Sequence, residues 1–135
     1  MRVVIDTNVA VSAVLLPRSV PRQAFDRALE HGTILISSAT MTELNDVLHR
    51  PHFDKYVHED ERLEFLAMWV RDAELVIITE VVTACRDPKD DKVLELALSG
   101  QATHIISGDE DLLVLHPFRG VEILTPQAFL VQETG

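Results

Sequence analysis

The sequence has one cysteine and no long hydrophobic segment. Cys85 has no partner for an internal disulfide, and nothing around it suggests a cysteine-based metal site. No apolar run approaches the roughly 20 residues of a transmembrane helix. Met1-Arg2 leads directly into the first predicted strand, which leaves no room for a signal peptide. We therefore expect a cytoplasmic protein without a membrane segment, built as a single domain over residues 1–135.

Basic residues are also few. The 12 lysines and arginines are outnumbered by 22 aspartates and glutamates, which gives a formal net charge of -10. A protein that coats duplex DNA needs a basic surface, so this balance argues against that class. It does not exclude a nucleic acid as substrate, because acids that surround divalent cations are neutralised when the cations bind. A strongly basic partner would also fit this surface.

Short apolar segments alternate with amphipathic segments along the chain. Segments typical of strands lie at residues 3–5, 34–36, 75–78, 105–106 and 121–124. Helical spacing is found between them, at residues 9–15, 21–31, 40–48, 58–73 and 93–98, and again after Thr125-Pro126. Strands that alternate with helices imply parallel pairing with right-handed crossovers. The expected fold class is α/β, a three-layer α/β/α sandwich around a parallel sheet of about five strands.

Polar residues with reactive side chains follow two of the predicted strands. Asp6-Thr7-Asn8 comes directly after residues 3–5, and Ser107-Gly108-Asp109 comes directly after residues 105–106. Open α/β sheets bind ligands at the carboxyl ends of their strands. Asp6 and Asp109 are therefore expected at the same edge of the sheet.

Further acids begin helices that follow strands, and these should reach the same edge. Glu43 lies three residues after Thr40, and Asp90 and Asp91 precede the helix at residues 93–98. Each has a structural explanation, because Asp90 or Asp91 can cap a helix and Thr40 with Glu43 fits a capping box. Asp6 and Asp109 are likewise possible caps.

Electrostatic repulsion decides against capping as the whole explanation. Two carboxylates about 5 Å apart repel by roughly 3 kcal/mol at an effective dielectric near 20, whereas a good cap contributes about 1 kcal/mol. A cluster of this kind must take up protons, admit solvent or bind a cation. An all-oxygen acidic pocket suits Mg²⁺ or Mn²⁺.

The order and spacing of these motifs resemble the PIN-domain family. The motifs are Asp6-Thr7-Asn8, Glu43 in a Thr-x-x-Glu-Leu helix start, Asp91 before a helix, and Ser107-Gly108-Asp109. The family includes structure-specific and single-strand nucleases and the toxin halves of VapBC-type toxin–antitoxin pairs. The resemblance covers essentially the whole chain, and a PIN domain of this size looks most like a prokaryotic toxin component.

The resemblance implies a metal-dependent endoribonuclease. Its metal-binding acids would be Asp6, Glu43, Asp91 and Asp109, with Glu43 acting through water or orienting the nucleophile. Asp87, Asp90 and Asp91 share one loop; Asp91 has the best spacing to Asp109, and Asp90 is the alternative third acid. Supporting roles would go to Thr7, Asn8 and Ser107, whereas Asp111 is a peripheral ligand or a solvated acid.

The resemblance also implies partners. We expect an RNA substrate, a cognate antitoxin that places a basic side chain in the acidic pocket, and a homodimer or higher homo-oligomer. Basic residues that flank the predicted edge and could contact phosphates are Arg18, Arg86 and Lys89, although a solvated surface explains them equally well. Lys92 can instead pair with Asp91 and Glu95. His49 and His52 are separated by Arg50-Pro51, which favours a loop or surface role over metal binding.

Three other functions make different demands on the sequence. A haloacid-dehalogenase-type phosphohydrolase needs a second aspartate two residues after the first, where this chain has Asn8. A response-regulator receiver needs an aspartate at the end of the third strand, where this chain has Ile78-Thr79-Glu80. A catalytically weak PIN-like binding module remains the main alternative, although such a module would be expected to lose some of the acids.

Overall fold

Five short parallel strands form the centre of the protein. The structure is a computed structural model that describes residues 1–134. The strands are β1 (Arg2–Ile5), β2 (Thr33–Ile36), β3 (Glu74–Leu75), β4 (His104–Ile106) and β5 (Glu122–Leu124). Their order in the sheet is β3-β2-β1-β4-β5, and each neighbouring pair is parallel. From β1 in the middle, the chain builds one side of the sheet through β2 and β3, then crosses over and builds the other side through β4 and β5.

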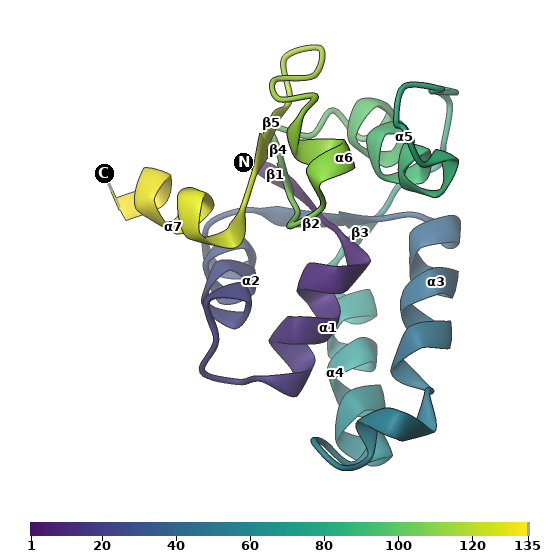
Figure 1. Ribbon diagram of the computed structural model, residues 1–135, viewed down its shortest axis with the longest axis vertical. Helices are drawn as coiled ribbons and strands as arrows, with labels where there is room; N and C mark the ends of the chain where they lie inside the picture. The colour runs from purple at the N-terminus through teal and green to yellow at the C-terminus, as the bar shows by residue number, and fades with distance from the viewer. Residues whose placement is uncertain (135) are drawn as a thin grey trace.

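Helices cover both faces of this sheet (Figure 1). One face packs against α1 (Thr7–Leu15), α2 (Val20–His31), α3 (Ser38–Leu48), α4 (Glu59–Asp72) and α7 (Pro126–Thr134). The other face packs against α5 (Asp91–Ser99) and α6 (Glu110–Leu113). Short 3₁₀ turns, η1 (Pro51–Phe53) and η2 (Pro88–Asp90), precede α4 and α5. The predicted three-layer sandwich with about five strands is therefore confirmed. In the described part of the chain, no helix combines the length and apolar character needed to cross a bilayer.

The alternation of side chains along β1 divides the core into two. Val3 and Ile5 point into one hydrophobic cluster, together with Phe25 of α2 and Trp69 of α4. Val4 points into the other cluster, on the side of α5. A strand buried on both faces is continuously apolar, which explains why β1 reads as an unbroken hydrophobic run.

The start of α3 differs from the sequence prediction. Ser37 and Thr40 form the capping box: the Ser37 hydroxyl accepts a hydrogen bond from Thr40 N at 3.1 Å, and Thr40 Oγ1 accepts one from Ser37 N at 2.9 Å. The helix therefore begins at Ser38 rather than Thr40, and the predicted box of Thr40 with Glu43 is wrong. Glu43 lies beyond the first turn, so its carboxylate is not engaged in capping.

The third strand is shorter than the predicted residues 75–78. Val76 N still donates to Ile36 O of β2 at 2.8 Å. Beyond it, the amides of Thr79 and Glu80 donate to Ser99 Oγ of α5 at 3.0 and 3.1 Å. These hydrogen bonds to Ser99 replace strand pairing, so β3 ends after two residues although the segment is strongly apolar.

Candidate active site

Asp6 and Asp109 meet at the carboxyl ends of the neighbouring strands β1 and β4. The connection is Ser107, which is fully buried. Its hydroxyl donates to Asp6 Oδ2 at 2.8 Å and accepts from Asp109 N at 3.0 Å. Asp6 occupies the N-cap position of α1 but makes no side-chain capping bond, so capping does not explain this buried acid. The strand-end acids are therefore held together through one serine.

A tighter group of acids extends from Asp109. Carboxylate oxygens of Asp90, Asp109 and Asp111 all lie within 4.8 Å of one another. Asp109 Oδ1 accepts a hydrogen bond from Asp111 N at 2.9 Å, which fixes its position at the start of α6. Asp90 Oδ2 is buried and has no hydrogen-bond partner. An unpartnered carboxylate oxygen beside two further acids fits the oxygen ligands that hard divalent cations take.

The Asp91 carboxylate points away from these acids, towards the loop that contains Ala84 and Cys85. Its Oδ1 accepts hydrogen bonds from the amides of Ala84 and Cys85 at 3.1 and 2.8 Å. The Cys85 amide has the larger effect, and together the two amides hold the pKa of Asp91 below its ordinary value despite the cost of desolvation. Successive residues at a helix start differ by about 100° in direction, so only one of the two neighbouring aspartates can face the cluster. The structure places Asp90 there, whereas the sequence spacing to Asp109 favours Asp91.

Glu43 approaches the site from α3 and is bound to a lysine. Lys92 Nζ of α5 forms an ion pair with Glu43 Oε2 and also donates to Lys89 O at 2.9 Å. Partial burial alone would raise the pKa of Glu43, but hydrogen bonds from Lys92 and Thr7 and the charges of Lys92 and Lys89 hold it below its usual value. The sequence offers Asp91 and Glu95 as possible partners of Lys92, but the structure pairs it with Glu43. This ion pair joins α5 to α3, and the spacing of residues along a single helix cannot predict it.

Burial and mutual repulsion favour protonation at two of the acids. Desolvation raises the pKa of Asp6, although the Ser107 hydroxyl and the Thr7 amide oppose this, and the charges of Asp109 and Glu43 add to it. Desolvation, the close approach of the Asp109 carboxyl group and the charges of neighbouring aspartates raise the pKa of Asp90 to about 7. A cluster with these properties has a strong electrostatic preference for a bound cation.

An open hollow of about 340 Å³ adjoins these acids. Its walls come from α1, α2 and the segments after β4 and β5, and its lining residues are Asn8, Val9, Ser12, Pro21, Gly108, Asp109 and Pro126. Asn8 thus faces the approach to Asp109, while Thr7 is buried beside Asp6. The predicted phosphate contacts Arg18, Arg86 and Lys89 are all exposed.

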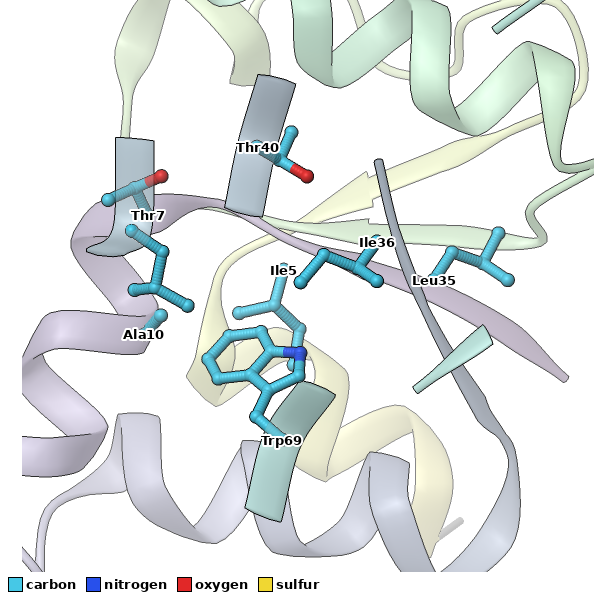
Figure 2. A pocket seen from close by; sticks show the side chains of 8 residues that line it. Ile5, Thr7, Ala10, Leu35, Ile36, Thr40 and Trp69 are labelled. Atoms are coloured by element: carbon cyan, nitrogen blue, oxygen red, sulfur yellow. The ribbon is translucent and has the colours of Figure 1, made fainter. Parts of the chain in front are cut away.

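A small internal cavity lies under the edge of the sheet, between β1, β2 and the helices α3 and α4 (Figure 2). In Figure 2 the indole ring of Trp69 lies beneath Ile5 and Ile36, and Thr7 and Thr40 lie above them. The cavity measures only about 10 Å³, which is room for about one water molecule. It is therefore too small for a nucleotide, whereas the open hollow beside Asp109 has room for part of a substrate.

Comparison with known proteins agrees with this architecture. The uncharacterized protein MJ1680 of Methanocaldococcus jannaschii is 30% identical over 117 residues, which cover 85% of this chain and 75% of that protein. PAE2754 from Pyrobaculum aerophilum has a TM-score of 0.62 at 14% identity, covering 99% of this chain and 90% of that one.

Two other solved structures share the fold. VapBC2 from Rickettsia felis, bound to a DNA fragment from the promoter, has a TM-score of 0.60 at 13% identity and covers 91% of this chain and 97% of that chain. FitAcB from Neisseria gonorrhoeae has a TM-score of 0.58 at 17% identity, with coverages of 93% and 98%. The family model of the PIN domain matches residues 2–111, a span that contains all the acids described above. The chain therefore belongs to the PIN domain family.

Proposed function

We propose that this protein is a Mg²⁺- or Mn²⁺-dependent endoribonuclease whose single nuclease domain spans residues 1–135. The observation that carries the proposal is the group of Asp90, Asp109 and Asp111, with its unpartnered buried oxygen, linked through Ser107 to Asp6. Membership of the PIN domain family supports a nuclease, and the open hollow beside Asp109 leaves room for a nucleic acid strand.

Each acid has a role in this proposal. Asp90, Asp109 and Asp111 would hold the cation, and Asp6 would complete its ligands. A bound divalent cation supplies a water of lowered pKa and neutralises charge that develops on the phosphate. Ser107 keeps Asp6 in place by donating to Oδ2.

The charged pair beside the cluster has a separate role. Glu43 would remain ionised next to Lys92 and orient the attacking water. Lys92 holds the glutamate without competing for the cation.

We further propose that the protein is the toxin half of a toxin–antitoxin pair and acts in the cytoplasm. The fold similarity to VapBC2 and the net charge of -10 support this. A small antitoxin would place a basic side chain against Asp90 and Asp109, and the nuclease would assemble as a homodimer or higher homo-oligomer. Co-expression with a neighbouring small protein should give a complex that purifies as one species and relieves growth arrest. A neighbouring protein that does neither would contradict this part of the proposal.

The catalytic proposal is tested by cleavage of a fluorescent single-stranded RNA in Mg²⁺ or Mn²⁺. Wild type should cleave, EDTA should stop cleavage, and Asp6→Asn and Asp109→Asn should each lose at least 100-fold in rate. Undiminished cleavage by Asp109→Asn would overturn the mechanism. Metal binding without cleavage of single-stranded or structured RNA would instead identify a binding module.

A further inference from the structure

A second hollow lies at the opposite end of α1 from the acids. It measures about 380 Å³ and is formed by α1 and the connection between α3 and α4, through residues Ser12, Leu15, Leu16, His52, Phe53, Lys55 and Tyr56. Ser12 also lines the hollow beside Asp109, together with Asn8. Asn8, Ser12 and Leu15 are spaced by four and three residues, so one face of α1 lines both hollows. Figure 1 shows α1 running from the sheet towards this connection.

The second hollow carries an exposed aromatic ring and a free positive charge. Tyr56, the only tyrosine of the chain, is 59% exposed. Lys55 Nζ lies 5.1 Å from the centre of its ring, and Lys55 has no salt bridge among residues 1–134. The neighbouring Asp54 is bound to Arg62, so its charge is compensated. Lys55 is the charged side chain among the residues that line this hollow, and the acids Glu59, Asp60 and Glu61 at the start of α4 do not line it.

The distance along α1 from the acids to the second hollow suits a short piece of nucleic acid. The nine residues of α1 span about 14 Å at 1.5 Å per residue. That distance corresponds to about four nucleotides of a stacked strand at 3.4 Å each. Proteins hold single strands by combining aromatic platforms for bases with positive charge for phosphates, which are the two features found around Tyr56.

We propose that the hollow around Tyr56 binds a base of single-stranded RNA, about four nucleotides from the bond that the acids cleave. The base stacks on Tyr56, Lys55 contacts a phosphate, and the strand crosses the face of α1 that contains Ser12. This inference rests on the proposed nuclease function and adds a substrate subsite to it. Lys55, the charged residue in the lining, favours a phosphate over the basic antitoxin segment as its neighbour.

The test compares a single-stranded octanucleotide, long enough to reach both hollows, with a dinucleotide that reaches only the acids. Tyr56→Ala should raise the octanucleotide KM, and its Kd from fluorescence anisotropy, about tenfold. Its kcat and its cleavage of the dinucleotide should stay within twofold of wild type. Tyr56→Phe should retain wild-type values because the ring remains. Lys55→Gln should weaken octanucleotide binding, whereas Arg71→Gln, which removes an exposed charge from the end of α4, should not.

The outcomes separate the two proposals. If wild type cleaves both RNAs and Tyr56→Ala affects them equally, or affects neither, the subsite is wrong while the nuclease stands. If wild type cleaves neither RNA, the nuclease proposal fails, and the anisotropy of Tyr56→Ala still decides whether RNA binds here. Loss of antitoxin binding by Tyr56→Ala with unchanged RNA binding would identify a protein-docking site and overturn the inference. Circular dichroism of each variant checks that it is folded.

Discussion

At the residue scale, Asp90 and Asp91 are chain neighbours in opposite electrostatic surroundings. Asp91 accepts two backbone amides, and these lower its pKa. Asp90 faces other carboxylates, and its Oδ2 has no partner. The first arrangement stabilises the fold, whereas the second costs stability unless a cation is bound.

Substitution of the two aspartates should therefore separate function from stability. Asp90→Asn should weaken Mn²⁺ binding at least tenfold and leave the melting temperature of the metal-free protein unchanged or higher, because it removes a repulsive charge. Asp91→Ala should lower the melting temperature by several degrees, because the Ala84 and Cys85 amides lose their acceptor. Calorimetric titration with Mn²⁺ and thermal melts in EDTA measure both. Stronger loss of metal binding in Asp91→Ala would reverse the assignment.

The raised pKa of Asp90 predicts how stability depends on pH. Between its ordinary value of 3.8 and about 7, folded Asp90 keeps a proton that the unfolded chain has released. The folded state binds more protons across this window, so the stability of the metal-free protein falls as pH rises through it and levels off above it. Asp90→Asn removes this contribution. Its melting temperature relative to wild type in EDTA should therefore be higher at pH 8 than at pH 5, and an equal difference at both would contradict the prediction.

Much of the site is readable from the sequence at this scale, but not all of it. Asp6 and Asp109 follow apolar runs, and the edge of a parallel sheet brings such residues together. The choice between Asp90 and Asp91 depends on the amides of Ala84 and Cys85, which belong to an irregular loop. The ion pair of Glu43 with Lys92 joins α3 to α5, and no spacing in the sequence predicts it.

At the element scale, one buried arginine organises the connection between α3 and α4. Arg62 of α4 is fully buried. Its guanidinium donates to Leu48 O at 2.8 Å, to Arg50 O at 3.4 Å and to Val57 O, and it pairs with Asp54 at 3.0 Å. A planar group with several donors suits this set of carbonyls, which a lysine cannot match. The connection that carries Lys55 and Tyr56 is thus held from within.

Arg62→Met should destabilise the protein by about 3 kcal/mol, because buried carbonyls lose their donors. Denaturation with urea measures the change. The matched control is Asp54→Asn, whose carboxylate is 57% exposed and should cost less than about 1 kcal/mol. Equal losses in the two variants would show that the ion pair, rather than the carbonyl contacts, stabilises the connection.

The segment after α4 shows where sequence patterns mislead at this scale. Apolar character over residues 75–78 predicted a four-residue strand, yet Leu75 and Ile77 are 59% and 76% exposed. Hydrophobicity indicates a strand only when the backbone can pair, and here Ser99 takes up the amides of Thr79 and Glu80. The long periodic helices α2 and α4 were predicted well because amphipathic spacing decides them without such competition.

At the scale of the whole molecule, the net charge of -10 limits how the proposed RNA substrate would be held. Two or three phosphate contacts, made by residues such as Lys55, Arg18 and Lys89, would release few counterions. A plot of log Kd against log KCl concentration should therefore have a slope of about 1.4 to 2.1, at roughly 0.7 per phosphate for a single strand. Anisotropy of the octanucleotide at fixed Mn²⁺ measures it, and Lys55→Gln should lower the slope by about 0.7. A slope several times larger would indicate a basic surface elsewhere.

The pairing of β1 with β4 has a consequence for synthesis of the chain in the cell. Ser107 and Asp6, which touch in the folded protein, are 101 positions apart in the sequence. A polypeptide emerging from the ribosome has Asp6 and Glu43 early but lacks Asp109 and Asp111 until most of the chain has been translated. On the proposed function, the nascent chain lacks two of the acids that would hold the cation, so cleavage of the cell's own RNA would begin only when synthesis is almost complete.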